Sequence, residues 1–225
     1  MPRIAAYYIP EADDPLAQAG ASWLGRDAGT NDALPQPPIP GIAALTASPR
    51  RYGFHATLKA PMRLASGVGA DDLVAALEWI AADIPPFPAP SLRVGLLDGF
   101  LALLEAEPSA ALRALADGIV AGLDRFRAPP DEAELARRHP ERLDERGRAL
   151  LARYGYPYVL ERWRFHMTLS ERLDEAMAAR LLPEAERWFA ASLAAPRAIR
   201  SIALCLEAAP GADFRVIRRV SLGSA

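Results

Sequence analysis

The chain has 225 residues, of which about half are apolar and about a quarter charged, the usual balance for a globular protein with a sizeable core. Its net charge of −2 argues against a broad nucleic-acid surface, which is normally strongly basic, although a local group of arginines can still bind a small anion. The single cysteine, Cys205, excludes an internal disulfide and a cysteine-rich metal site. No membrane span or signal peptide is evident, so we expect a cytoplasmic protein.

The first half of the chain alternates strand and helix patterns, bounded by glycine, proline and acidic residues. In chain order, the predicted elements are strand 4–9, helix 14–24, strand 52–64, helix 71–82 and strands 92–97 and 100–105. The last two strands meet at Asp98 and Gly99, a pair that is typical of a tight hairpin turn.

The second half repeats this order with one addition. The predicted elements are helix 110–126, a charge-dense helical segment 131–154 interrupted at Pro140, strand 158–169, helix 174–193 and strands 199–207 and 214–222. Helix 174–193 contains Pro183, where a restart is possible. Segment 131–154 has no counterpart in the first half, so it is interpreted as an insert.

A repeated phrase marks the two halves: F-H-x-T-L occurs at 54–58 and again at 165–169. Each copy lies on a predicted strand that is followed by a helix and two further strands. This duplication predicts an α+β fold in which two pseudo-symmetric lobes with antiparallel-rich sheets face a central cleft. We expect one bilobal domain over 1–225, with lobes of about 1–107 and 108–225.

Strand alternation separates each phrase into two rows of side chains. The apolar members, Phe54, Ala56, Leu58, Phe165, Met167 and Leu169, are predicted to face the core. His55 and Thr57 then share the opposite face with Lys59, and His166 and Thr168 share it with Arg164. Each lobe thus offers an imidazole, a hydroxyl and a cation to the cleft.

Two such rows facing each other suit a phosphate group. Hydroxyls and cations hold the non-bridging oxygens, while one neutral imidazole accepts a proton and one imidazolium donates a proton. Histidine serves both roles because its ordinary pKa is about 6.5. No metal motif or phosphate-binding P-loop accompanies the histidines, so we expect neither a metal nor another cofactor.

The doubled motif resembles the 2H phosphoesterase superfamily, which is defined by two H-x-[ST] motifs in facing lobes. The stretches YYIP, RYGFHATLKAP and RYGYPYVLERWRFHMTLSERL are most similar to its branch found in phosphonate-utilisation operons. The resemblance covers essentially the whole chain. It implies a metal-independent phosphodiesterase in which His55 and His166 are catalytic and Thr57 and Thr168 bind phosphate.

The phosphonate branch implies a small phosphorylated substrate, a phosphoribosyl 1,2-cyclic phosphate that is opened to a ribose bisphosphate. Two alternatives stay open. One is the same chemistry on 2′,3′-cyclic or 2′–5′-linked RNA ends or nucleotides, and the other is a non-catalytic protein that binds sugar phosphates or nucleotides. The sequence does not distinguish the basic from the acidic histidine, because the two motifs are nearly equivalent.

Further cations have weaker support. Lys59 and Arg164 are expected to contact substrate from the histidine face, and Arg51, just before the first motif, is expected to reach a phosphate. The third histidine, His139, lies in the charged insert and is predicted to be a surface residue. The insert itself is a candidate lid over the site.

Overall fold

The computed structural model describes residues 1–223 and shows a mixed α+β fold, which confirms the predicted class. Its strands are β1 (Arg3–Tyr8), β2 (Ala56–Met62), β3 (Phe87–Pro88), β4 (Leu92–Leu97), β5 (Phe100–Glu105), β6 (His166–Arg172), β7 (Ala198–Ile199), β8 (Ser201–Glu207) and β9 (Phe214–Ser221). Its helices are α1 (Pro15–Leu24), α2 (Ile42–Leu45), α3 (Ala47–Tyr52), α4 (Ala70–Ala82), α5 (Ala110–Leu123), α6 (Glu132–Ala136), α7 (Glu145–Tyr154) and α8 (Glu175–Ala194).

One antiparallel sheet organises the described residues, in the order β4-β5-β6-β2-β1-β8-β9. The two motif strands, β2 and β6, lie next to each other at its centre, but they share a single register pair, Ala56 with Met167. The sheet therefore divides at this seam into a half of β4, β5 and β6 and a half of β2, β1, β8 and β9.

These halves of the sheet do not follow the halves of the chain. The hairpin β4–β5, from the first half of the chain, pairs with β6, whereas β8 and β9, from the second half, continue the sheet beyond β1. The expected lobes 1–107 and 108–225 thus exchange their hairpins. The sequence repeat shows the order of elements but not which strands pair, because a hairpin can join either neighbouring lobe.

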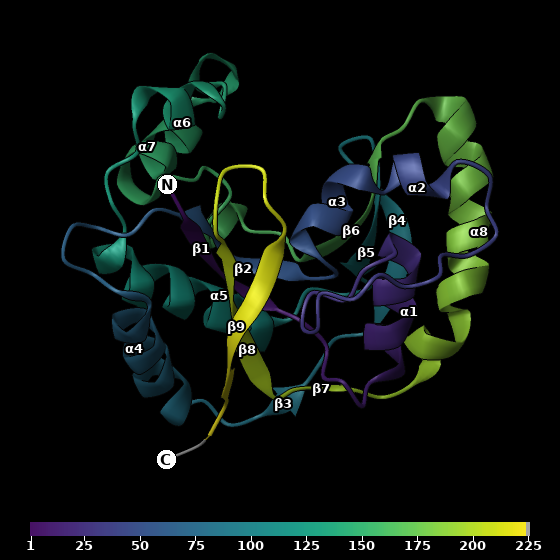
Figure 1. Cartoon of the computed structure of the whole chain (residues 1–225), viewed down its shortest axis with the longest axis horizontal. Helices are drawn as coiled ribbons and strands as arrows, with labels where there is room; N and C mark the ends of the chain where they lie inside the picture. The colour runs from purple at the N-terminus through teal and green to yellow at the C-terminus, as the bar shows by residue number, and fades with distance from the viewer. Residues whose placement is uncertain (224–225) are drawn as a thin grey trace.

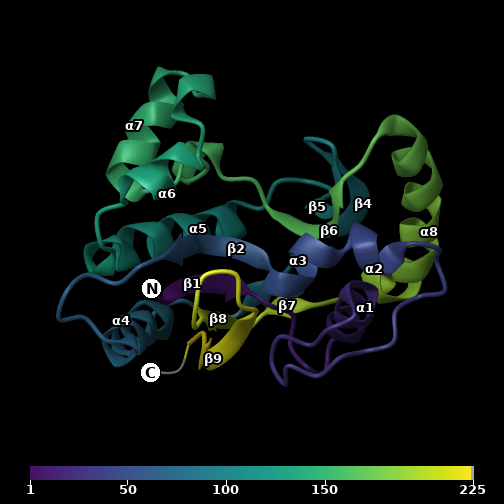
Figure 2. The same cartoon turned by 45° about the horizontal axis from the view of Figure 1, so that its top comes forward.

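Helices cover the sheet in two groups that match its halves (Figure 1). Helices α4 and α5 contact the side of β2 and β9, and α1 and α8 contact the side of β4 to β6. The insert helices α6 and α7 stand away from the sheet, above α5 in the turned view (Figure 2).

The main core lies between the sheet and these helices, and both motifs contribute to it as predicted. The apolar motif members Phe54, Ala56, Leu58, Phe165, Met167 and Leu169 are all buried there. A smaller cluster of Ala5, Tyr7, Ala203, Cys205 and Phe214 lies apart from the main core. Cys205 is buried, as expected of an inert thiol.

Local structure differs from the prediction just before each motif. Tyr52, expected to begin a strand, is instead the last residue of helix α3 (Ala47–Tyr52). Pro49 lies in the first turn of this helix and is tolerated because that turn needs no intrahelical donor. Gly53, at φ 79°, ends this helix. The strand therefore begins at Ala56, and His55 lies at its entrance. In the second half, a 3-10 turn at Leu160–Arg162 delays β6 until His166.

Two other predicted features are observed. The turn between β4 and β5 has positive φ at both Asp98 (48°) and Gly99 (87°), as a type I′ hairpin requires. The predicted helix 174–193 is observed as α8, which runs continuously from Glu175 to Ala194, so no restart occurs at Pro183. Among residues 1–223, no helix is both long and apolar enough to cross a membrane.

Candidate active site

Both histidines are held in the same way by the chain that precedes them. His55 Nδ1 lies 2.8 Å from the carbonyl oxygen of Gly53, and His166 Nδ1 lies 2.8 Å from that of Arg164. Because a carbonyl oxygen only accepts, each Nδ1 carries the proton and donates. Each neutral imidazole therefore keeps Nε2 unprotonated and available, which is the state that a general base needs.

The pairing of β2 with β6 brings the two motifs together. Since Ala56 lies opposite Met167 in an antiparallel pair, Thr57 comes next to His166 and His55 next to Thr168. A further link crosses the seam: the indole Nε1 of Trp163 donates to the carbonyl oxygen of Thr57 at 2.8 Å. The structure thus holds both H-x-T motifs side by side.

His55 is the more enclosed of the two. Its ring lies against that of Tyr7, with 3.8 Å between ring centroids, and its Nε2 lies 3.2 Å from the hydroxyl oxygen of Thr57. Burial lowers the pKa of His55 to about 4, while its bond to Gly53 opposes this and the charge of His166 lowers the pKa further. His55 is therefore neutral near pH 7.

Burial also lowers the pKa of His166, and the neighbouring charge of Arg164 acts in the same direction. The hydrogen bond to the Arg164 carbonyl and the negative charge of Asp98 oppose that shift. The two imidazoles therefore share a sequence motif but differ in surroundings, because Asp98 favours the charged form of His166.

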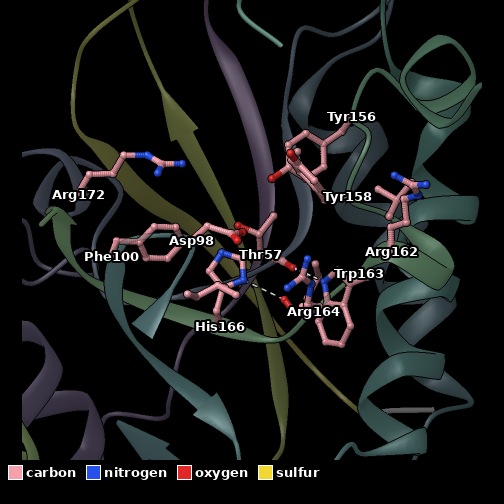
Figure 3. Close-up of a pocket in the computed structure, with 14 residues that line it drawn as sticks. Thr57, Asp98, Phe100, Tyr156, Tyr158, Arg162, Trp163, Arg164, His166 and Arg172 are labelled. Carbon is pink, nitrogen blue, oxygen red and sulfur yellow. Dashed lines mark hydrogen bonds between the residues drawn. The ribbon is translucent and has the colours of Figure 1, made fainter. Parts of the chain in front are cut away.

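A pocket of about 200 Å³ opens beside His166 (Figure 3). Its lining residues are Thr57, Leu58, Ala60, Leu97, Asp98, Phe100, Tyr156, Tyr158, Val159, Arg162, Trp163, Arg164, His166 and Arg172. This volume lies below the range of about 300–1,000 Å³ that is typical of pockets for drug-sized ligands. Its size and its three arginines suit a small anionic molecule.

The predicted site residues fall into two groups. Thr57, His166 and Arg164 line the pocket. His55 is not among the lining residues, but its Nε2 contacts the hydroxyl of Thr57, which is one of them. Thr168 lies beside Ala102 of β5 and is not among the lining residues.

Lys59 lies away from the pocket, contrary to the alternation from which it was expected there. It is only 3 % exposed, and its Nζ lies 2.8 Å from Asp124 Oδ1 and 3.4 Å from the carbonyl oxygen of Val120. The cause is a register shift in the pairing of β1 with β2, where Tyr7 lies opposite Thr57 but Ala6 lies opposite Lys59. Such a bulge breaks strict alternation and changes the direction of the following side chain.

Arg51 also has another partner. Its Nη2 donates to the hydroxyl of Tyr52 at 2.7 Å, and the guanidinium lies over that ring, outside the pocket lining. His139 is exposed beside Glu141 in the insert, as predicted.

Several lining residues were missed by sequence reasoning. Arg172 has the same parity as His166 and Thr168, so extending the alternating row of β6 indicates it. Arg162 lies in the 3-10 turn before β6, where strand alternation does not apply. The sequence predicts Asp98 only as a turn residue, and its place in the pocket depends on the hairpin exchange. Within residues 1–223, no three side chains of His, Cys, Asp or Glu gather as a metal site would require.

Comparison with known proteins gives a family and a set of longer relatives. The family model described as "Protein of unknown function (DUF1045)" matches residues 57–215. Two proteins named ribose 1,5-bisphosphate phosphokinase PhnN are similar to the chain, one from Janthinobacterium sp. (strain Marseille) at 42 % identity and one from Laribacter hongkongensis (strain HLHK9) at 36 %. Each similarity covers 98 % of this chain, but 51 % and 52 % of the relatives, so the chain spans about half of their length.

Solved structures with a similar arrangement include one described as a phosphoesterase, at 15 % identity and a TM-score of 0.42, covering 98 % of this chain and 97 % of that one. Another is E. coli LigT complexed with NADP+, at 15 % identity and a TM-score of 0.44, covering 100 % of both chains. The family assignment rests on the sequence match, which extends over well more than half of the residues. The chain therefore belongs to the family described as protein of unknown function, DUF1045.

Proposed function

We propose that this protein is a metal-independent cyclic phosphodiesterase of the 2H type. The observation that carries the proposal is the placement of two histidines where adjacent strands β2 and β6 begin, each held by a hydrogen bond from Nδ1 to a carbonyl oxygen two residues earlier and each with a threonine two residues later. A protein that only binds phosphate would be served better by arginine or lysine, which remain charged at neutral pH.

In the proposed reaction, one histidine accepts a proton from a water molecule, whose oxygen forms a new bond to phosphorus. One phosphorus–oxygen bond of the ring breaks, and the other histidine donates a proton to the oxygen that leaves. When substrate binds, the attacking water replaces Thr57 as the donor to His55, and the hydroxyls of Thr57 and Thr168 donate hydrogen bonds to the non-bridging oxygens. Arg164 stabilises the negative charge that builds up on these oxygens. The water, the two protons and the ring opening balance, with no metal or redox partner involved.

We assign the base to His55 and the acid to His166. His55 is enclosed beside Tyr7, remains neutral and already accepts a hydrogen bond from Thr57. His166 lies in the pocket with Asp98, whose charge offsets part of the lowering of the His166 pKa by burial and by Arg164. A bound phosphate adds a second negative charge and favours the imidazolium further.

The proposed substrate is a phosphoribosyl 1,2-cyclic phosphate, a small phosphorylated sugar of phosphonate metabolism. Breaking its bond from phosphorus to O2 while keeping the bond to O1 gives ribose 1,5-bisphosphate. The longer relatives are named as kinases of that compound, and this chain matches only half of their length. The chain has one lysine, Lys59, and no G-K-[ST] sequence, so we place the kinase activity of the relatives in their other half.

Phosphorus NMR tests the proposal directly. The purified protein, with and without a chelator, is incubated with the 1,2-cyclic sugar phosphate and with a 2′,3′-cyclic nucleotide. We expect the 1,2-cyclic signal to convert to that of a phosphomonoester at the same rate in both conditions. Turnover of the nucleotide alone would favour the alternative function on nucleotides or RNA ends, and loss of turnover with chelator would refute the metal-free mechanism.

Three histidine variants complete the test. His55→Ala and His166→Ala should each lower kcat by about 10²–10⁴-fold, the usual contribution of a general acid or base. His139→Ala is the matched control, because this histidine is exposed in the insert and should leave kcat unchanged. Binding without turnover by the wild-type protein would instead support the non-catalytic alternative.

A further inference from the structure

The three arginines that line the pocket have different surroundings. Arg162 is hydrogen-bonded to Asp144, at the start of α7. Arg164 lies beside His166, whose imidazole its own carbonyl holds, so its side chain belongs with the reacting phosphate. The side chain of Arg172 has no carboxylate partner and no hydrogen bond among residues 1–223.

Arg172 also lies on a different side of the catalytic group. Figure 3 shows Arg164 and Arg172 on opposite sides of His166, with Phe100 between Arg172 and the imidazole. Two cations on opposite sides of the imidazole can each contact a different phosphate of one substrate. An arginine that is unpaired at the edge of a small pocket is available to form a two-pronged bond to a phosphate, which its planar guanidinium favours.

The local backbone leaves room for this side chain. Arg172 ends β6 and lies opposite Phe100, beyond a register shift in the pairing of β5 with β6. Gly99 of the neighbouring turn has no side chain, and a Cβ there would come within 3.3 Å of Arg172 Nη1. The glycine thus meets two needs, the positive φ of the turn and the close approach of the guanidinium.

We propose that Arg172 binds a second, non-reacting phosphate of the substrate, so that the enzyme selects sugar cyclic phosphates that carry another phosphate group. This proposal rests on the function proposed above and adds the residue that determines specificity. Asp98 is the one carboxylate among the lining residues, and its charge acts on His166.

The test compares ribose 1,2-cyclic phosphate with and without a 5-phosphate. For the wild-type protein we expect a lower KM for the 5-phosphorylated compound. Arg172→Gln should raise that KM by about 10–100-fold, the size of one lost charge-assisted contact, and change kcat/KM for the compound without a 5-phosphate by less than threefold. Arg172→Lys should retain part of the discrimination, because it keeps the charge but loses the planar geometry.

Arg180→Gln is the matched control, since Arg180 is an exposed arginine of α8 that does not line this pocket. An equal loss on both compounds in Arg172→Gln, or no discrimination by the wild type, would overturn the proposal. So would a preference for adenosine 2′,3′-cyclic phosphate that Arg172→Gln leaves unchanged.

A binding measurement separates this proposal from the catalytic one. Ribose 5-phosphate and ribose are titrated calorimetrically into the wild type and Arg172→Gln. If neither cyclic compound is hydrolysed, the catalytic proposal fails, while a tenfold weaker binding of ribose 5-phosphate in Arg172→Gln still supports the phosphate subsite. Equal binding by both proteins refutes the subsite whatever the activity.

Discussion

The buried ion pair of Lys59 with Asp124 allows a test of how the first motif strand is supported. Both side chains are nearly inaccessible, at 3 % and 8 % exposure, and their charged atoms lie 2.8 Å apart. The partners differ in what else they contact. Asp124 also pairs with Arg127 at 2.9 Å and with Arg153 at 3.5 Å, whereas Asp124 is the one carboxylate near Lys59 in the described residues.

Removing Asp124 should therefore lower the free energy of unfolding more than removing Lys59 does. Asp124→Asn leaves the Lys59 charge buried without a counter-ion and should cost about 3–5 kcal/mol, the range for a broken buried pair. Lys59→Met leaves Asp124 with two arginines, and methionine fills most of the same space, so the cost should be about 1–2 kcal/mol. Neither change removes a group that we place in contact with substrate.

The assay is urea unfolding followed by circular dichroism, with linear extrapolation, and kcat and KM measured on the folded variants. The loss in Asp124→Asn should shrink as pH rises, because burial already lowers the pKa of Lys59 and a neutral amine needs no counter-ion. Equal destabilisation by the two variants would refute the account of the network. A large rise in KM in a stable Lys59→Met protein would refute the placement of Lys59 away from substrate.

Two further predictions concern the histidines and the seam. If His55 is the base and His166 the acid, kcat/KM should fall as pH drops through about 4 and also as pH rises past the lowered pKa of His166, giving an optimum below about 6.5. An optimum above pH 7 would contradict this assignment. Trp163→Phe removes the indole bond to Thr57 and should lower kcat by about tenfold through misplacement of the motifs. Its control is Trp188→Phe, which loses a similar bond to Ala19 far from the pocket; equal effects on kcat would show that the seam bond has no special role.

The sequence was sufficient for the parts of the fold that depend on local pattern. The spacing of apolar residues predicts a helix over 71–82, and α4 begins one residue earlier. The pair Asp98 and Gly99 predicts the hairpin turn that is observed there. The doubled motif gave both histidines and their inward-facing apolar neighbours. These features follow from the spacing of side chains within one element, which the chain displays directly.

The remainder depends on long-range pairing. Which hairpin joins which motif strand is determined by contacts between residues far apart in the chain, and no local pattern reports them. The bulge that removes Lys59 from the histidine face exists only in the register of β1 against β2. The position of Arg162 also depends on a residue far away in the chain. Arg113 holds the 3-10 turn that contains Arg162, because it donates hydrogen bonds to the carbonyl oxygens of Leu160 and Trp163.

The exchange of hairpins has a consequence for folding and for engineering. Strand β1 pairs along its length with β8, and Arg3 forms a hydrogen-bonded ion pair with Glu207, 204 residues away. A fragment that ends after β5 would contain the first motif but would lack β8 and β9, which complete that half of the sheet. The other fragment would contain β6 without either of its neighbours, β5 and β2. Separately produced fragments should therefore be poorly folded alone and should regain structure only when mixed. Activity should appear in the mixture together with folded structure, because the strands that complete each half of the sheet come from the other fragment.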